Sequence, residues 1–327
     1  MTRATAVIAA LCFGGLGLAG LGVGGSTTSG AAATRTVTLG VLGDANRFYQ
    51  QTGQRSTIRH VLISWNQGVT WGSKLPVLLE SLRPTPMLGL GTLDWRTKSE
   101  VVTPRDIAMG KGDSFLLAVN AAITGFGSRV YLRPLPEMNN YHRPYCAFDA
   151  SGRSKGGSYS TAMYRKAFAR IAVVVRGGAR RDMNAALRSL GLPGVQSDLP
   201  QNAVRLVWNP QGYGSPQLRA NSARAYYPGD RYVDVVANDL YDQGYNAAWG
   251  ANESLYRAHP GKPFAIAEWG LWSIDDPAYV ARMAAFARSH RRVEFISYFS
   301  GSVGSPFDLS VKPRSRAVYR RLITPLG

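Results

Sequence analysis

The stretch that spans residues 133–140 limits the possible fold more than any other part of this 327-residue chain. It follows a short apolar run, residues 130–132, which is typical of a buried strand. Two prolines in the stretch cannot donate ladder hydrogen bonds, so the strand must end there, and Glu137 lies just beyond its C-terminal end. Residues 262–270 repeat the pattern, with an apolar strand that ends at Glu268. Parallel α/β barrels build their sites at the C-terminal ends of their strands, so this repetition favours such a barrel.

Strand-like and helix-like segments alternate along most of the chain. Eight apolar segments are predicted as strands, over or ending near residues 36–42, 58–64, 86–90, 130–132, 204–208, 233–237, 264–267 and 295–299. Helical periodicity lies between them, and residues 104–126 are predicted to form a single helix closed by glycines. The sequence has no Pro/Ser-rich linker, repeat or break in composition. The predicted fold class is therefore α/β, as a single (β/α)8 TIM barrel over residues 34–327.

Residues 1–33 have the organisation of a secretory signal peptide. Arg3 gives a short basic start, an apolar run extends from residue 4 to about residue 23, and small residues end the segment. The alternative is a membrane anchor, but a Gly- and Ala-rich run without charge on its far side favours cleavage. We therefore expect a secreted, extracellular protein. Cys146 is then the remaining cysteine, and no intrachain disulfide can form.

The formal net charge of +18 is strongly basic. It reflects either a preference for Arg in a secreted protein or attraction to an anionic cell envelope, polysaccharide or nucleic acid. The basic residues are spread along the sequence and no nucleic-acid-binding motif is present, so we expect no nucleic-acid partner. Electrostatic association with an anionic cell envelope remains open. We expect the protein to be a monomer.

Sequence motifs for several other chemistries are missing. The chain has no Gly-x-Ser-x-Gly elbow, which argues against an α/β-hydrolase. It has no His-Glu-x-x-His motif and four histidines in total, which argues against a zinc hydrolase. It has no P-loop, and a Gly-x-Gly-x-x-Gly match at residues 15–20 follows no strand and lies in the leader. We therefore expect neither a cofactor nor a metal ion.

The sequence Arg-Pro-Leu-Pro-Glu-Met-Asn-Asn at residues 133–140 resembles the strand-four signature of glycoside hydrolase family 26, the β-mannanase family of barrel clan A. In that signature a His usually precedes the Glu, whereas this chain has Pro136. Two more motifs match in the expected order: Tyr-Pro-Gly-Asp at residues 227–230 with Tyr-Val-Asp at 232–234, and Lys-Pro-Phe-Ala-Ile-Ala-Glu-Trp-Gly at 262–270. The resemblance implies a barrel that cleaves a β-linked polysaccharide, with β-mannan as the first choice and β-xylan or β-glucan as alternatives.

The same resemblance implies that Glu137 is the acid/base and Glu268 the nucleophile of a retaining glycoside hydrolase. Two carboxylates at strand ends suit this double-displacement reaction. A nearby cation such as Arg133 would keep the nucleophile charged. The family also implies a tyrosine hydroxyl on the nucleophile, for which we choose Tyr241. The alternative is a catalytically silent barrel that binds cell-envelope polysaccharide, with Pro136 as one sign of lost catalysis.

Aromatic residues at strand ends are candidate sugar platforms, because aromatic faces stack on the apolar faces of sugar rings. For each tryptophan, core packing is the alternative. The family resemblance adds Trp208 and Asn209 after strand five, and it puts Tyr298 and Phe299 where the clan commonly has a Trp. The predicted substrate-binding set is Arg133, Asn139, Trp65, Trp95, Trp208, Asn209, Tyr241, Trp269, Trp272 and Tyr298.

Overall fold

The computed structural model describes residues 36–94, 96–244 and 248–327. The predicted signal peptide, residues 1–33, and the predicted platform residue Trp95 lie outside the described residues. All described residues belong to one unit, Arg35–Gly327. Within these residues, no helix combines the length and the apolar character that crossing a lipid bilayer requires.

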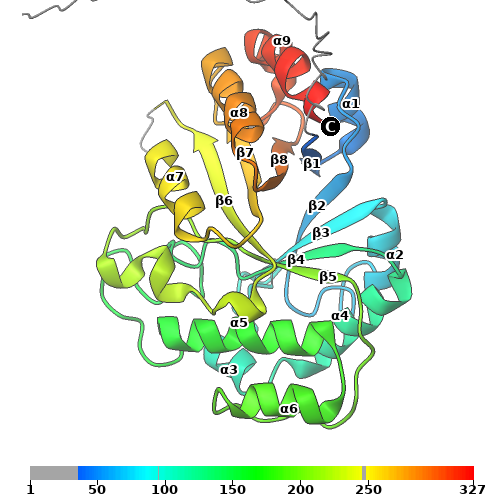
Figure 1. Cartoon of the computed structure of the whole chain (residues 1–327), viewed down its shortest axis with the longest axis vertical. Coiled ribbons are helices and arrows are strands. Elements are labelled where there is room, and N and C mark those ends of the chain that lie inside the picture. Colours follow the sequence, from blue (N-terminus) through cyan, green and yellow to red (C-terminus); the bar gives the residue numbers. More distant parts are fainter. Residues whose placement is uncertain (1–35, 95, 245–247) are drawn as a thin grey trace, which may run out of the picture. The chain divides into compact units, whose positions relative to one another are not determined.

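Eight parallel strands form a closed barrel in which each strand pairs with its neighbours in sequence and the last pairs with the first (Figure 1). The strands are β1 (Thr38–Gly43), β2 (Ile58–Ile63), β3 (Thr85–Leu90), β4 (Val130–Pro134), β5 (Val204–Trp208), β6 (Val235–Asp242), β7 (Phe264–Leu271) and β8 (Val293–Gly301). The predicted α/β class and TIM barrel are confirmed. Because the strands are parallel, their C-terminal ends all lie at one mouth of the barrel.

Side chains along each strand alternate between two apolar environments. One set fills the barrel interior: Ile58, Met87, Tyr131, Val207, Val235, Ala237, Ala265, Ala267 and Phe295. The other set faces the surrounding helices and joins the larger core. The position of a residue along its strand therefore decides whether it can reach the mouth through the interior or is covered by a helix.

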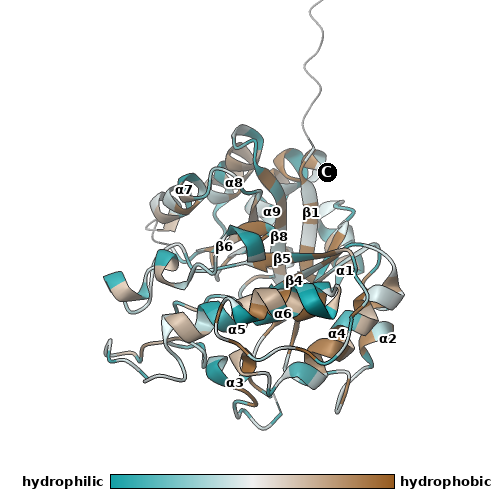
Figure 2. Cartoon of the chain, turned by 60° about the horizontal axis from the view of Figure 1, so that its bottom comes forward, coloured by the Kyte–Doolittle hydropathy of each residue, from teal (hydrophilic) through white to brown (hydrophobic). Residues whose placement is uncertain are grey.

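The surrounding helices are α1 (Ala45–Thr52), α2 (Leu75–Ser81), α3 (Pro104–Ala108), α4 (Asp113–Phe126), α5 (Thr161–Arg176), α6 (Arg180–Arg188), α7 (Ala248–Ala258), α8 (Pro277–Ser289) and α9 (Pro313–Leu322). Short 3₁₀ turns are η1 (Arg219–Asn221), η2 (Ala223–Tyr226), η3 (Asp230–Tyr232), η4 (Leu309–Val311) and η5 (Thr324–Leu326). Asp44 and Asp276 begin α1 and α8, since each side chain accepts hydrogen bonds from two first-turn N–H groups. Figure 2 shows that the helices around the barrel carry both hydrophilic and hydrophobic residues, as elements with one covered face require.

The single helix predicted over residues 104–126 is wrong, because the segment forms two helices. α3 ends at Ala108, and α4 begins at Asp113. Gly110 lies between them with a φ of 87°, a conformation that glycine adopts easily and that a right-handed helix cannot contain. The glycine at this position therefore separates the two helices.

Candidate active site

β4 and the turn after it position Arg133 and Glu137. Tyr131 faces the barrel interior, so Arg133 faces it too, and Arg133 is fully buried. The strand ends at Pro134, and the chain turns through Glu137, whose φ of 55° is unusual for a residue with a side chain. The N–H of Glu137 donates to the carbonyl of Asn209 at 2.6 Å, which ties the turn to the segment after β5.

A β-bulge in β7 turns Glu268 into the barrel. Ala265 and Ala267 face the interior, so strict alternation would point Glu268 toward the helices. The pairing with β6 instead shifts by one residue between Ile266 and Glu268. A bulge of this kind re-aims the side chains that follow it. Glu268 consequently contacts the interior residues, and Trp269 takes the outward position.

Arg133 links three side chains across the interior. Its guanidinium forms ion pairs with Glu268 and Asp239, and its Nε donates to Oδ1 of Asn209 at 3.0 Å. Burial raises the pKa of Asp239 well above its ordinary value, and the charge of Glu268 adds to this effect against the pull of Arg133. Burial opposes the charge of Arg133, but Asp239 and Glu268 raise its pKa overall. The guanidinium therefore stays charged at the centre of the cluster.

Both carboxylate oxygens of Glu268 accept a hydrogen bond. The hydroxyl of Tyr241 donates to Oε2 at 2.6 Å, and Arg133 donates to Oε1. Burial, followed by the charge of Glu268, raises the pKa of Tyr241 well above its ordinary value, so this hydroxyl keeps its proton and acts as a donor. The two contacts predicted for the nucleophile candidate are both present. They fix the orientation of the Glu268 carboxylate.

Glu137 is held by residues from two loops. Nε of Arg143 donates to its Oε2 at 2.8 Å, Nη2 of Arg143 contacts the same oxygen, and Gln211 donates to its Oε1 at 3.1 Å. Burial opposes the charge of Arg143, but Glu137 and then Glu268 contribute to a raised pKa for this guanidinium. Glu137 and Glu268, each 6% exposed, therefore act on the same two arginines, Arg133 and Arg143.

Two predicted substrate ligands, Asn139 and Asn209, instead hold other parts of the site in place. Oδ1 of Asn139 accepts from the N–H of Gln211 at 2.8 Å, and its Nδ2 donates to the carbonyl of the same residue at 2.9 Å. Asn209 orients Arg133, as described above. Both asparagines are fully buried, and their amide groups are already bonded to the protein. The prediction that they bind substrate is therefore not met in this conformation.

The sequence-based set did not include the two residues that contact the carboxylate of Glu137. Arg143 lies in the loop after β4, and Gln211 lies in the loop after β5. Their sequence signal is weak, because a polar residue in a mouth loop points to the site only when the loop folds back on it. Gln211 lies three residues beyond the end of β5 and could have been nominated for testing, whereas Arg143 lies nine residues beyond the end of β4.

The prediction that Trp208, Trp269 and Tyr298 bind sugar is wrong. Each is fully buried in the layer between barrel and helices. Trp269 stacks on Tyr319 of α9 with ring centroids 5.6 Å apart, and Trp208 packs edge-on against Tyr227 at 4.8 Å. Since neighbours along a strand face opposite sides, these aromatic rings cannot line the barrel interior.

Trp65 is also a core residue, and its predicted platform role is wrong. It is 1% exposed and packs against Phe115 of α4, with ring centroids 5.2 Å apart. Trp272 differs, because 47% of it is exposed. Its ring lies 6.1 Å from that of Tyr241 and 5.1 Å from that of Phe307. Trp272 therefore remains a candidate sugar platform beside the tyrosine that holds Glu268.

His60 lies in the barrel interior beside Arg133, a placement that the sequence analysis did not single out. A Cβ on Gly89 would lie 3.2 Å from Nε2 of His60, 2.7 Å from Leu62 and 3.8 Å from Nη1 of Arg133, so the glycine makes room for all three. In the described part of the chain, neither ring nitrogen of His60 has a hydrogen-bond partner. Burial, and then the charge of Arg133, lowers the pKa of His60 well below its ordinary value. A neutral imidazole thus lies near the guanidinium.

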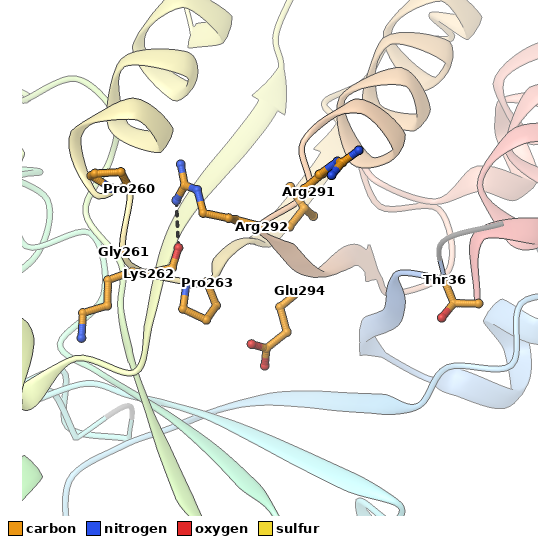
Figure 3. Close-up of a pocket in the computed structure, with 9 residues that line it drawn as sticks. Thr36, Pro260, Gly261, Lys262, Pro263, Arg291, Arg292 and Glu294 are labelled. Atoms are coloured by element: carbon orange, nitrogen blue, oxygen red, sulfur yellow. Dashed lines mark hydrogen bonds between the residues drawn. The ribbon is translucent and has the colours of Figure 1, made fainter. Parts of the chain in front are cut away.

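A hollow of about 490 Å³ is lined by residues before or at the start of β7 and β8 (Figure 3). It therefore lies at the end of the barrel opposite the two glutamates, which lie in or after the C-terminal half of their strands. Arg292 turns toward the carbonyl of Lys262 and donates to it at 2.8 Å. Glu294 in this hollow is already bonded to Tyr131 and Arg205. No group of three or more His, Cys, Asp or Glu within the described ranges is arranged to hold a metal ion.

Comparison with known proteins identifies the architecture. A mannanase from Bacillus subtilis superposes with a TM-score of 0.57 over 89% of this chain and 86% of its own, at 16% identity. The family 26 domain of an endo-β-mannanase/endo-β-glucanase from Prevotella bryantii gives a TM-score of 0.55 over 88% of this chain and 89% of its own, at 15% identity. The chain has the fold of the family 26 glycoside hydrolases. The resemblance predicted from the sequence is thus confirmed at the level of the fold.

The amino-acid sequence of this chain differs strongly from the sequences of the proteins it resembles. Endoglucanase H from Acetivibrio thermocellus is 22% identical over 261 residues, which are 80% of this chain. The matched part of this chain covers 25% of the length of that curated relative. No family model matches the sequence. The family 26 architecture is therefore shared while most of the individual residues differ.

Proposed function

We propose that this protein is a retaining glycoside hydrolase of the family 26 type that acts on a β-linked polysaccharide. The observation that carries the proposal is the pair of buried carboxylates at the mouth, Glu137 and Glu268, which pair with Arg143 and Arg133 respectively. Each carboxylate has its own set of hydrogen-bond donors, so the two can play different roles. Different surroundings for two carboxyl groups are what an acid and a nucleophile require.

In the proposed reaction Glu268 is the nucleophile. Its carboxylate attacks the anomeric carbon while Glu137 gives a proton to the glycosidic oxygen, so the C–O bond breaks and a glycosyl ester on Glu268 forms. Glu137, now ionised, removes a proton from water, and the resulting oxygen attacks the same carbon. The ester bond then breaks, Glu268 is released, and the anomeric configuration is retained. Tyr241 and Arg133 hold the carboxylate of Glu268 in position for the attack.

The substrate backbone is proposed from the relatives. β-Mannan is the first choice, because the structural neighbours include a mannanase and an endo-β-mannanase/endo-β-glucanase. β-Glucan is supported by the sequence similarity to an endoglucanase, and β-xylan remains an alternative. Trp272, exposed beside Tyr241, offers a surface for stacking one sugar ring.

The test is a panel of β-mannan, β-xylan and β-glucan with sizing of the products and NMR of the first anomer released. Retention of configuration with at least one polymer supports the proposal, and inversion overturns it. In Glu137→Ala, azide should replace the missing base and give a β-glycosyl azide from an aryl glycoside with a good leaving group. Binding of a glycan without hydrolysis by the unaltered protein would instead support a catalytically silent, polysaccharide-binding barrel.

We also propose that the protein is secreted, monomeric and attracted to the anionic cell envelope. Residues 1–33 support secretion through their basic start, apolar run and small-residue end. The net charge of +18 supports the attraction. N-terminal sequencing of protein from culture medium tests cleavage, and sedimentation tests the oligomeric state. Intact leader in the medium, or a dimer at low concentration, would contradict the respective point.

A further inference from the structure

The contact between Arg143 and Glu137 conflicts with one half of the proposed reaction. A general acid must carry a proton, but both Nε and Nη2 of Arg143 donate to the same oxygen of Glu137. Arginine has no acceptor for a carboxyl proton, so this arrangement suits the ionised carboxylate. Gln211 donates to the other oxygen. The geometry therefore matches the base step, and Arg143 must leave Glu137 before the acid step.

Arg143 is well placed to move. Its side chain is 39% exposed, whereas that of Glu137 is 8% exposed. Glu137 is fixed by its backbone bond to Asn209, but the side chain of Arg143 donates, within the described residues, to Glu137 alone. The guanidinium can thus swing toward the cleft without disturbing the core. Because Glu137 would protonate the leaving-group oxygen in the proposed reaction, a guanidinium that contacts Glu137 lies near the departing sugar.

The charge balance of the site shows what Arg143 would need once it has moved. Two carboxylates, on Glu137 and Glu268, face two guanidinium groups, on Arg133 and Arg143, because burial raises the pKa of Asp239 and favours its neutral form. Protonation of Glu137 removes one negative charge and leaves Arg143 without an ion-pair partner. An unpaired and partly buried charge is costly. A negative group on the substrate would restore both the pair and the original formal charge.

We propose that the substrate is an acidic glycan, and that a carboxylate or phosphate on its leaving-group side takes Arg143 away from Glu137. This inference rests on the proposed function. The charged group pairs with Arg143, Glu137 takes a proton from solvent, and that proton passes to the glycosidic oxygen when the bond breaks. After the acidic sugar departs, Arg143 returns to Glu137 and stabilises the carboxylate that removes a proton from water. Arg143 is therefore a specificity-determining residue as well as a positioning residue.

The distribution of charge over the outer surface supports an anionic substrate. Residues 277–327 contain nine basic and two acidic residues, and the two acids, Glu294 and Asp308, are already paired with Arg205 and Arg47. The exposed arginines of this segment have no ion-pair partner within the described residues: Arg282, Arg288, Arg291, Arg314, Arg320 and Arg321. Such a surface raises the local concentration of a polyanion.

The test measures binding, so it does not depend on turnover. The ligands are short β-1,4-linked manno- and gluco-oligosaccharides, each as neutral, carboxymethylated and phosphorylated forms, at about 0.15 M salt, where long-range attraction is screened beyond about 8 Å. Glu137→Gln leaves Arg143 without its charged partner. We expect this variant to bind a charged ligand about tenfold or more tightly than the unaltered protein does, with little change for the neutral form. The carboxymethylated and phosphorylated arms distinguish the two anions.

Two further variants separate a local effect from a general one. Glu137→Gln combined with Arg143→Gln should lose the gain in affinity. Glu137→Gln combined with Arg153→Gln should keep it, because Arg153 carries the same charge in the same loop but pairs with Asp149 at the surface. If Glu137→Gln gains no affinity for any charged ligand over its neutral counterpart, the inference is wrong even when neutral glycans are hydrolysed. A gain without any hydrolysis would support the anion site and overturn only the proposed enzyme activity.

Discussion

The two ends of the barrel hold the same three kinds of side chain in the same arrangement. At each end a glutamate accepts hydrogen bonds from one tyrosine hydroxyl and one arginine. Burial raises the pKa of both tyrosines, so each hydroxyl keeps its proton. The trio at the mouth is Glu268, Arg133 and Tyr241, and the trio at the base is Glu294, Arg205 and Tyr131.

The surroundings of the two trios differ in ways that matter for chemistry. At the mouth, Arg133 also pairs with Asp239, and the separately held Glu137 contributes to the same electrostatic cluster. At the base, Glu294 is the one acidic side chain that pairs with Arg205 within the described residues. A glutamate held by an arginine and a tyrosine is therefore a satisfied ion pair in both places. A second carboxylate with its own donors is what distinguishes the mouth.

The largest expected difference between the two ends is the effect of replacing Glu268 at the mouth or Glu294 at the base. Glu268→Gln removes the proposed nucleophile, and we expect kcat to fall on the order of 10⁴-fold or more. Glu294→Gln should leave kcat within about twofold and reduce the free energy of unfolding by about 1–3 kcal/mol, because charged hydrogen bonds at the base are lost. Initial rates and denaturant titrations measure the two effects. Equal losses of kcat in both variants would show that the mouth has no special role.

Replacing the tyrosine at each end should give a smaller difference in kcat/KM between the mouth and the base. Tyr241→Phe removes a donor from the proposed nucleophile, and the loss of about 1.5–3 kcal/mol expected for such a bond corresponds to a roughly 10- to 150-fold lower kcat/KM. Tyr131→Phe removes the matching donor from Glu294, so its cost should appear in the unfolding midpoint while kcat/KM is kept. A kcat/KM unchanged by Tyr241→Phe would remove this hydroxyl from the mechanism.

The sequence allowed the barrel and the two mouth glutamates to be predicted, because apolar runs that end at prolines or glutamates carry local information. It did not reveal the bulge in β7, which lets Glu268 follow the interior residue Ala267 and still face inward. That bulge depends on pairing with β6 and β8, so no local pattern encodes it.

The errors at aromatic positions have a local origin. Trp208 and Asn209 are adjacent, so only one of them can face the interior, and transferring both from a family pattern ignored this alternation. Arg143 was missed for a different reason. Its contact with Glu137 requires the loop after β4 to fold back over the turn, which is a tertiary property.

The smallest expected effect is on the pH dependence of stability, and it arises from His60, which lies beside Arg133 of the mouth trio. The folded state depresses the pKa of His60, mainly through burial, so the unfolded chain binds a proton that the folded chain does not once the pH is below about 6.5. The contribution of His60 to the free energy of unfolding should therefore be fully present above that value and fall by up to about 1.4 kcal/mol per pH unit as the pH decreases further.

His60→Leu should remove most of this slope, because the unfolded chain then lacks the site that binds the extra proton. His142→Gln, in an exposed loop position, is the matched control and should keep the slope. Denaturant titrations from pH 7 to pH 5 give the measurement, and identical slopes for His60→Leu and the unaltered protein would mean that His60 titrates normally inside the barrel.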